Sequence, residues 1–311
     1  MFLLLQKRLE TVKHQKLIFI LINILIVLVL IELLSYQALC YHYKYIYDKS
    51  LIQYSPVTIP NDDHLLTNFR PTEYRDKNKP PIFLFGCSYV DGAELKDNQT
   101  FSRKLADYTN RTVYNRGKSG LGIYYFYYLL NSEKIIKDLP QNPQYIIWVL
   151  IPDHILRMYR YRSVPFMGIY NLRSKIKNGQ IVTDNISCKF LHSFFTSVVV
   201  EEFIAEARYA NKAKTDFMFI KLFKESNKLI KKKFPNTKLV VVSFDLYNYI
   251  PKDYYRRLQL LKEEIPDIQI IDLNKEIPEI ADKQYILDDK IHPNEQAWDK
   301  IVPVLAKKLN L

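Results

Sequence analysis

The stretch FLFGCSYVDG, residues 83–92, joins an apolar run to two small residues and then to a second glycine. The chain of 311 residues has only 7 glycines, and two of them, Gly86 and Gly92, flank Ser88. Glycine lets a backbone turn tightly. Because the apolar run reads as a buried strand, we expect Ser88 on the turn between this strand and a helix. Serine is also a good helix cap, and the stretch alone favours that simpler role.

Apolar stretches of this kind recur after residue 80 and alternate with helical patterns. Near-continuous apolar runs are typical of parallel strands that are covered on both faces. The expected strands are 81–86, 112–115, 144–151, 238–244 and 268–273, and the expected helices are 100–108, 123–137, 216–233 and 254–264, with a last one from Pro293 that Pro303 should bend or shorten. This order predicts an α/β fold with an open, doubly wound parallel sheet, whose ligands lie at the carboxyl ends of the strands.

The rest of the chain divides by composition. Residues 1–16 read as a cytoplasmic N-terminus, 17–36 as a transmembrane signal anchor, 37–80 as a polar stalk and lead-in, and 81–311 as the α/β domain. Residues from about 155 to 215 do not follow the strand and helix alternation. We therefore expect an insertion there that covers the site.

The anchor is predicted from the stretch LIFILINILIVLVLIELL, residues 17–34, which only Asn23 and Glu32 interrupt. It is about long enough to span a hydrocarbon core of roughly 30 Å. Basic residues precede it, so the positive-inside rule keeps the N-terminus in the cytoplasm and places the rest outside, in the periplasm or at the cell surface. These basic residues are Lys7, Arg8, Lys13 and Lys16.

Two other kinds of signal would also place an apolar stretch near the N-terminus. A cleaved signal peptide would need a small-x-small site after the apolar core, and none follows. A lipoprotein signal ending at Cys40 would need a small residue before the cysteine, where the chain has Leu39. The three cysteines, which include Cys87 and Cys188, fit neither a disulfide framework nor a metal site, although a bridge between Cys40 and Cys188 stays open.

The chain is basic, with 45 Lys and Arg against 33 Asp and Glu and a formal charge of +12. The basic residues are dispersed, and the sequence has no helix-turn-helix, zinc-finger or RNA-binding signature. We therefore expect no nucleic-acid partner. An anionic membrane or glycan is the more natural neighbour for this charge.

Two further segments lie near the ends of expected elements. The stretch NRGKSGLG, residues 115–122, holds three of the seven glycines, and its backbone N–H groups could stabilise an oxyanion. In DDKIHPNEQAW, residues 288–298, Asp289 and His292 are three residues apart. A serine nucleophile needs a base, and the base needs a third group to hold its tautomer. The simpler alternatives are a flexible loop, and a turn Asp beside a helix-capping His.

Together these segments resemble the SGNH (GDSL-like) hydrolases, which have Ser, Gly, Asn and Asp-x-x-His in successive sequence blocks. GCS at 86–88 is similar to the first block, with Cys87 where the family has Asp, and DKIHP at 289–293 is similar to the last. The resemblance covers about residues 81–309 and implies a flavodoxin-like three-layer α/β/α fold without cofactor or metal. The catalytic residues that it implies are Ser88, Asp289, His292 and the oxyanion glycine Gly120.

The third block departs from the family pattern, because Pro152 stands where the family has Asn. Proline has no N–H, so one of three oxyanion donors is missing. Losing one donor typically costs about 10² to 10³ in rate. His154 could donate instead, or a donor could come from the insertion, for instance Arg157. A structural hydrogen bond at the strand end is an equally good role for His154.

The resemblance implies Ser-based acyl chemistry, and with the predicted anchor it leads us to expect a membrane-anchored serine esterase outside the cytoplasm. It would remove acyl groups from envelope carbohydrate or lipid through an acyl-Ser88 intermediate, and acetyl is the acyl group that we expect. Two alternatives stay open. One is an O-acyltransferase that modifies envelope polysaccharide with the same triad and receives its acyl group from a membrane partner. The other is a non-catalytic glycan-binding or assembly protein on a decayed hydrolase fold.

Overall fold

The computed structural model describes residues 18–27, 30, 69–120, 122–132, 136–137, 139–140, 142–158, 173–177, 180–184, 212–246 and 252–311. At its centre lies a five-stranded parallel sheet with the strand order β2-β1-β3-β6-β7. The strands are β1 (Ile82–Gly86), β2 (Val113–Gly117), β3 (Tyr145–Leu150), β6 (Lys238–Ser243) and β7 (Gln269–Asp272). This is the order of the flavodoxin-like doubly wound sheet, so the predicted α/β class and sheet type are confirmed.

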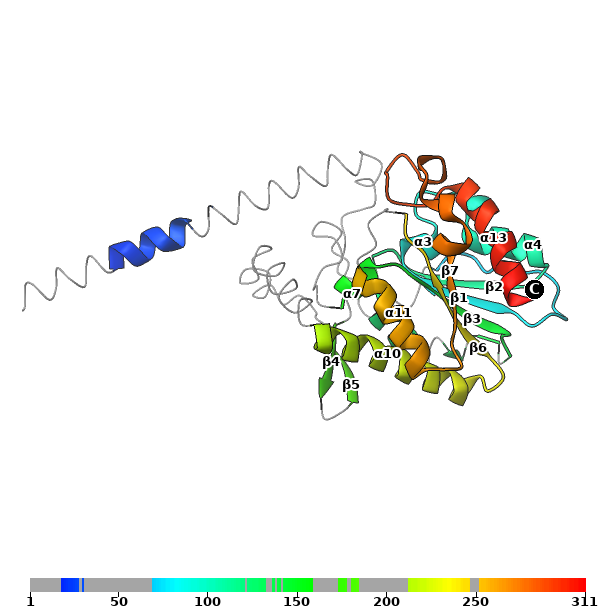
Figure 1. Cartoon of the computed structure of the whole chain (residues 1–311), viewed down its shortest axis with the longest axis horizontal. Helices are drawn as coiled ribbons and strands as arrows, with labels where there is room; N and C mark the ends of the chain where they lie inside the picture. Colours follow the sequence, from blue (N-terminus) through cyan, green and yellow to red (C-terminus); the bar gives the residue numbers. More distant parts are fainter. Residues whose placement is uncertain are drawn as a thin grey trace, which may run out of the picture.

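Helices cover both faces of this sheet and give the body three layers (Figure 1). On one face, a buried cluster around Trp148 and Phe126 includes residues of α5, α10 and α11. On the other face, a second cluster includes residues of α3, α4 and α13, where Phe101 stacks on Trp298 at 4.7 Å between ring centroids. The helices are α3 (Ser88–Asp91), α4 (Phe101–Thr109), α5 (Ile123–Asn131), α10 (Lys212–Lys233), α11 (Lys252–Glu264), α12 (Leu273–Glu276) and α13 (Glu295–Leu309).

Several predicted helix boundaries differ from the observed ones. The last helix begins at Glu295, not at Pro293, because the Asn294 side chain caps it by accepting the Ala297 N–H at 3.1 Å. Pro303 does not end this helix, which continues to Leu309. Helix α5 ends at Asn131, well before residue 137, and α10 begins four residues before the predicted 216.

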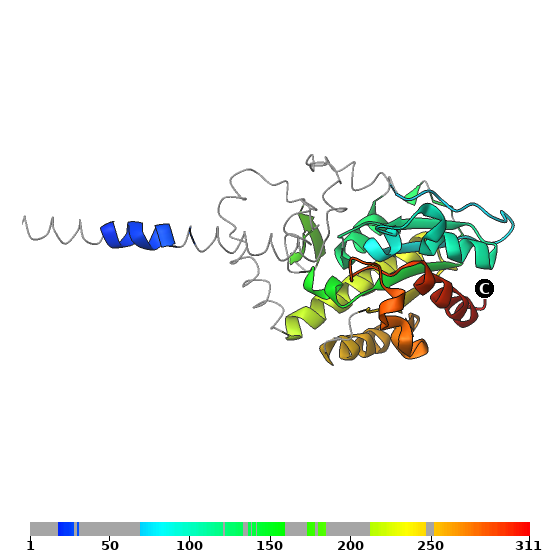
Figure 2. The ribbon, with the colours of Figure 1, turned by 90° about the horizontal axis from the view of Figure 1, so that it is seen from above.

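The predicted insertion at 155–215 is described only in part. Helix α7 (Asp153–Leu156) follows β3, and β4 (Arg173–Lys177) pairs antiparallel with β5 (Gln180–Asp184). This hairpin forms a sheet of its own, apart from the central one (Figure 2). That the insertion covers the site stays a prediction, because most of it, with Cys188, lies outside the described residues.

Much of the predicted anchor and stalk also lies outside the described residues, as does Cys40. Residues 18–27 are helical, and large apolar side chains from Ile18 to Val27 are 49–69% exposed (blue in Figure 1). Within the described part of the chain, no helix combines the length and the hydropathy that crossing a membrane requires.

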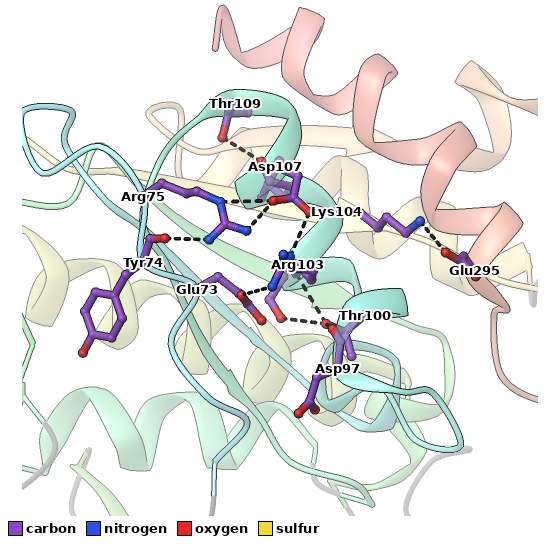
Figure 3. A network of polar contacts seen from close by, with 12 residues as sticks. Glu73, Tyr74, Arg75, Asp97, Thr100, Arg103, Lys104, Asp107, Thr109 and Glu295 are labelled. Atoms are coloured by element: carbon purple, nitrogen blue, oxygen red, sulfur yellow. Dashed lines mark hydrogen bonds and ion pairs between the residues drawn. The ribbon is translucent and has the colours of Figure 1, made fainter.

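The end of the predicted stalk packs on the α/β body. Glu73 pairs with Val113 at the start of β2, through two backbone hydrogen bonds of 3.0 Å. Arg75 next to it reaches Asp107 on α4 (Figure 3). The described residues from Phe69 onward therefore contact the domain that was predicted to begin at residue 81.

Candidate active site

Ser88 is the first residue of α3 and lies directly after the carboxyl end of β1, as the sequence predicted. The N-cap of this helix is Cys87, and no side chain caps it. The Ser88 Oγ contacts the Cys87 Sγ at 3.9 Å, and the residue is 9% exposed. The helix-cap alternative for Ser88 is therefore wrong, and its hydroxyl is held at the sheet edge without a capping role.

Gly86 is needed so that α3 can approach the end of β1 closely, more than for a turn. Among the described glycines only Gly92 and Gly120 have positive φ. A Cβ added at Gly86 would lie 2.5 Å from the Val90 Cγ2. The missing side chain thus lets α3 fold back against the end of its own strand.

Asp289 and His292 form a tight pair on the loop before α13. The Asp289 Oδ2 is hydrogen-bonded to the His292 Nδ1, and its Oδ1 accepts the N–H groups of Ile291 at 2.8 Å and His292 at 3.0 Å. Burial alone would raise the pKa of the Asp289 carboxyl, but the hydrogen bonds from His292 and Ile291 hold this pKa below its ordinary value. The helix-capping alternative for His292 is wrong, because Asn294 is the cap.

The pair also fixes which nitrogen of His292 can act as a base. With Nδ1 on the carboxylate, Nε2 is the nitrogen that remains to accept a proton. The His292 carbonyl accepts the Leu287 N–H at 2.8 Å, so backbone and ring are both held, and the residue is 6% exposed.

Tyr89 connects the serine segment to the histidine loop. Its hydroxyl donates to the Ile291 carbonyl at 2.9 Å, and its ring meets the His292 ring edge-on, with centroids 5.8 Å apart. Ser88 and His292 therefore lie on segments that touch. Among the described residues no hydrogen bond joins the two side chains themselves.

The glycine loop after β2 is fastened to the same turn. The Lys118 N–H donates to the Gly86 carbonyl at 3.0 Å, and Asp91 Oδ2 on α3 accepts both the N–H (3.1 Å) and the hydroxyl (2.5 Å) of Ser119. Gly120 has φ +79°, which side-chain-bearing residues rarely adopt. Within the described residues, the backbone N–H groups of Ser88 and Gly120 donate no hydrogen bond, which leaves both able to bind an oxyanion.

Asn115 is a site-supporting residue that sequence reasoning missed. It is fully buried on β2, and its Nδ2 donates to the Val90 carbonyl at 2.6 Å and to the Ser102 hydroxyl at 3.0 Å. Its Oδ1 accepts the Gly117 N–H at 2.9 Å. A polar residue on the same strand face as Val113 was the signal for it, and it ties β2 to the helix that carries Ser88.

His154 does not reach the serine segment through any described contact. It is fully buried, its Nδ1 accepts the Ile151 N–H at 3.4 Å, and its ring lies 5.3 Å from that of Trp148. Burial, and then the positive charge of Arg157, lower the pKa of this histidine well below its ordinary value. These contacts favour the structural alternative for His154.

Arg157, by contrast, lies beside the turn that carries Ser88. Its Nε pairs with Asp153 at 2.5 Å, and the side chain of Cys87, the neighbour of Ser88, helps to raise the pKa of its guanidinium. Its side chain is only 10% exposed. Pro152, at the predicted Asn position, is the N-cap of α7.

The arrangement as a whole suits nucleophilic chemistry. A serine, an oriented histidine–carboxylate pair and two backbone N–H groups come from the ends of neighbouring segments. Among the described residues, no three His, Cys, Asp or Glu side chains gather as metal ligands do.

Comparison with known proteins gives structural likenesses only. No protein-family model matches the chain, and no curated protein matches it in sequence. One similar solved structure is a lipolytic protein of the G-D-S-L family from Veillonella parvula, at 13% identity over 74% of this chain and 97% of that one, with a TM-score of 0.41.

Two others are a carbohydrate esterase family 2 enzyme from Corynascus thermopiles (Myceliophthora fergusii) and the salicylyl-acyltransferase SsfX3 of a tetracycline biosynthetic pathway. The first has 13% identity over 77% of this chain and 67% of that one, with a TM-score of 0.44. The second has 10% identity over 76% of this chain and 56% of that one, with a TM-score of 0.43. Because their TM-scores are below 0.5, these likenesses assign neither a family nor an activity to this chain. Any proposal about its activity has to be argued from its own residues.

Proposed function

We propose that this chain is a serine esterase of the SGNH type. Its substrate is acylated, most simply acetylated, envelope carbohydrate or lipid, from which it removes the acyl group. The observation that carries the proposal is the Asp289–His292 pair, held by Tyr89 against the segment that bears Ser88. A histidine whose Nδ1 binds a buried carboxylate is oriented as a general base.

The reaction proceeds through an acyl-enzyme. The His292 Nε2 takes the Ser88 proton while Oγ bonds to the ester carbonyl carbon, and the carbonyl electron pair moves onto its oxygen. The N–H groups of Ser88 and Gly120 bind this oxyanion. As the carbonyl re-forms, the alcohol leaves with the proton from His292. Water then attacks the acyl-Ser88, gives a proton to His292 and releases the acid, and that proton returns to Ser88.

The test is covalent labelling of the full chain, in detergent, with a fluorophosphonate probe and mass-spectrometric mapping. We expect an adduct on Ser88 that is lost in Ser88→Ala and reduced at least 100-fold in His292→Ala. Ser226→Ala is the matched control, because this serine is also buried but lies on α10, on the other face of the sheet. A folded chain that is never labelled at Ser88 would contradict the esterase and favour the binding or assembly alternative.

A transferase on the same site is the second candidate. Ser88 and His292 are only 9% and 6% exposed, and a site that excludes water favours an alcohol acceptor over hydrolysis. With 4-nitrophenyl acetate as donor and a β-glucan oligosaccharide as acceptor, an esterase releases acetate at the rate of nitrophenol. A transferase instead releases less acetate than nitrophenol and acetylates the sugar.

We propose in addition that residues 17–36 anchor the chain, with the α/β body outside the cytoplasm. The exposed apolar side chains of residues 18–27 support the anchor. The basic residues before them support the orientation, with the N-terminus in the cytoplasm. The full chain should stay in the membrane during alkaline carbonate extraction, and a variant that lacks residues 1–36 should be released. Protease added to spheroplasts should digest the body. Release of the full chain by carbonate would contradict the anchor.

A further inference from the structure

Arg157 reaches across three adjacent strand ends. It follows β3 through α7, and in the sheet β1 lies next to β3 with β2 beyond. Its guanidinium lies close enough to Cys87, after β1, for the two side chains to interact. Its side-chain stem lies along Gly122 after β2, where an added Cβ would be 3.0 Å from the Arg157 Cβ and 3.7 Å from its Cδ.

The two groups that Arg157 touches border the proposed oxyanion site. Cys87 precedes Ser88, and their side chains are in contact at 3.9 Å. Gly122 is two residues beyond Gly120. Arg157 thus lies beside near neighbours of both residues whose N–H groups are proposed to bind the oxyanion.

The charge of Arg157 is maintained in this buried position. Burial alone would lower the pKa of its guanidinium, but the Asp153 carboxylate and the Cys87 sulfur raise it above its ordinary value. The Asp153 side chain is 36% exposed and holds the Nε at 2.5 Å, so it orients the guanidinium from its solvent side. Sulfur is a weak hydrogen-bond acceptor, so exchanging the Cys87 contact for an oxyanion costs little.

We propose that Arg157 donates the third hydrogen bond to the oxyanion, in place of the amide that Pro152 lacks. The inference rests on the proposed function and adds a catalytic residue to it. A hydrogen bond from a cation to an anion is roughly twice as strong as one between neutral groups. A guanidinium here therefore stabilises the charge that develops in the transition state more than the neutral substrate carbonyl.

The experiment measures 4-nitrophenyl acetate hydrolysis by the full chain in detergent. Arg157→Met should lower kcat by about 10² to 10³ with KM changed less than threefold. Adding Pro152→Asn to Arg157→Met should recover at least tenfold, because an amide at the family position replaces the lost donor. Arg116→Met is the matched control and should keep parental activity, since this arginine stacks on Phe69 and Tyr114 instead.

A second variant guards against loss of fold. Asp153→Asn/Arg157→Met leaves no unpaired carboxylate on α7, and its melting midpoint and Ser88 labelling show whether the body is intact. Parental kcat in a folded Arg157 variant, or a loss that appears only in KM, overturns the inference. A parent chain that is neither labelled nor hydrolytic overturns the proposed esterase itself, which separates the two failures.

Discussion

His154 is a buried imidazole that the folded chain keeps neutral. Its folded pKa is well below the ordinary value of about 6.5, because burial and the Arg157 charge disfavour the cation. Below that pH the unfolded chain binds a proton that the folded chain does not. This residue therefore lowers the free energy of unfolding by up to about 1.4 kcal/mol for each pH unit below 6.5.

Replacing His154 should remove this acid sensitivity. His154→Asn should cost about 1–3 kcal/mol at pH 8, because it leaves a gap beside Trp148. The difference in free energy of unfolding between parent and variant should then become smaller as pH falls from 6.5 to 5. Urea unfolding of the full chain at several pH values measures it. Parallel stability curves would mean that His154 is protonated in the folded state.

Other residues of the site show what a sequence can and cannot tell. The place of Ser88 after β1 and the pairing of Asp289 with His292 were predictable, because a serine at the end of an apolar run and an Asp-x-x-His are local patterns. Tyr89 was not, since its hydroxyl finds its acceptor on Ile291, 202 residues later. The role of Asp91 depends likewise on Ser119 from another loop. Only the folded chain brings such pairs together.

At the scale of elements, the contact between β2 and α3 is decided by a missing side chain. A Cβ at Gly117, the last residue of β2, would lie 2.4 Å from the Asp91 nitrogen and 2.7 Å from the Val90 carbonyl carbon. These are backbone atoms of α3, which cannot yield without moving the turn that carries Ser88. Gly117→Ala should therefore cost about 3 kcal/mol or more and reduce fluorophosphonate labelling of Ser88.

Gly122→Ala is the comparison for this prediction. It has extended backbone, and its nearest neighbour would be a side-chain atom of Arg157 at 3.0 Å. We expect it to cost about 1 kcal/mol or less in urea unfolding. Equal losses in the two variants would show that α3 is free to shift away from β2.

Elements were predictable where the chain's own periodicity decides them. All five strands were expected within about two residues, because strands covered on both faces read as apolar runs. Helix ends were less accurate, since Asn294 and Ser132 set them through capping hydrogen bonds. The hairpin β4–β5 was not expected, because neither RSKIK nor QIVTD is a continuous apolar run like the strands of the central sheet.

On the scale of the whole molecule, residues 69–81 before β1 pack along the surface of the α/β body, and we call this segment the strap. Arg70 donates to the carbonyl oxygens of Asp91 and Gly92, both at 2.8 Å, and of Leu95 at 3.1 Å, and it pairs with Asp97 at 2.5 Å. Further along, Glu73 and Arg75 join Arg103 and Asp107 of α4, and Lys104 of that helix pairs with Glu295 of α13 (Figure 3). A lead-in predicted as stalk thus contacts the residues that follow Ser88 in the chain.

Arg70 in the strap and Arg103 on α4 should differ in their effect on stability. Arg70 is 24% exposed and binds three backbone carbonyls, so Arg70→Ala should cost about 2–4 kcal/mol, since hydrogen bonds from a charged group contribute about 1.5–3 kcal/mol. Arg103 is 40% exposed, its shorter ion pair (2.9 Å) is with the half-exposed Asp107, and the mostly buried Glu73 lies 3.5 Å away, so Arg103→Ala should cost about 0–1 kcal/mol. Urea unfolding of the full chain, followed by the fluorescence of the buried Trp148 and Trp298, compares them. If both substitutions lower the free energy of unfolding by less than about 1 kcal/mol, the strap lies on the body without stabilising it. The domain would then begin near residue 81.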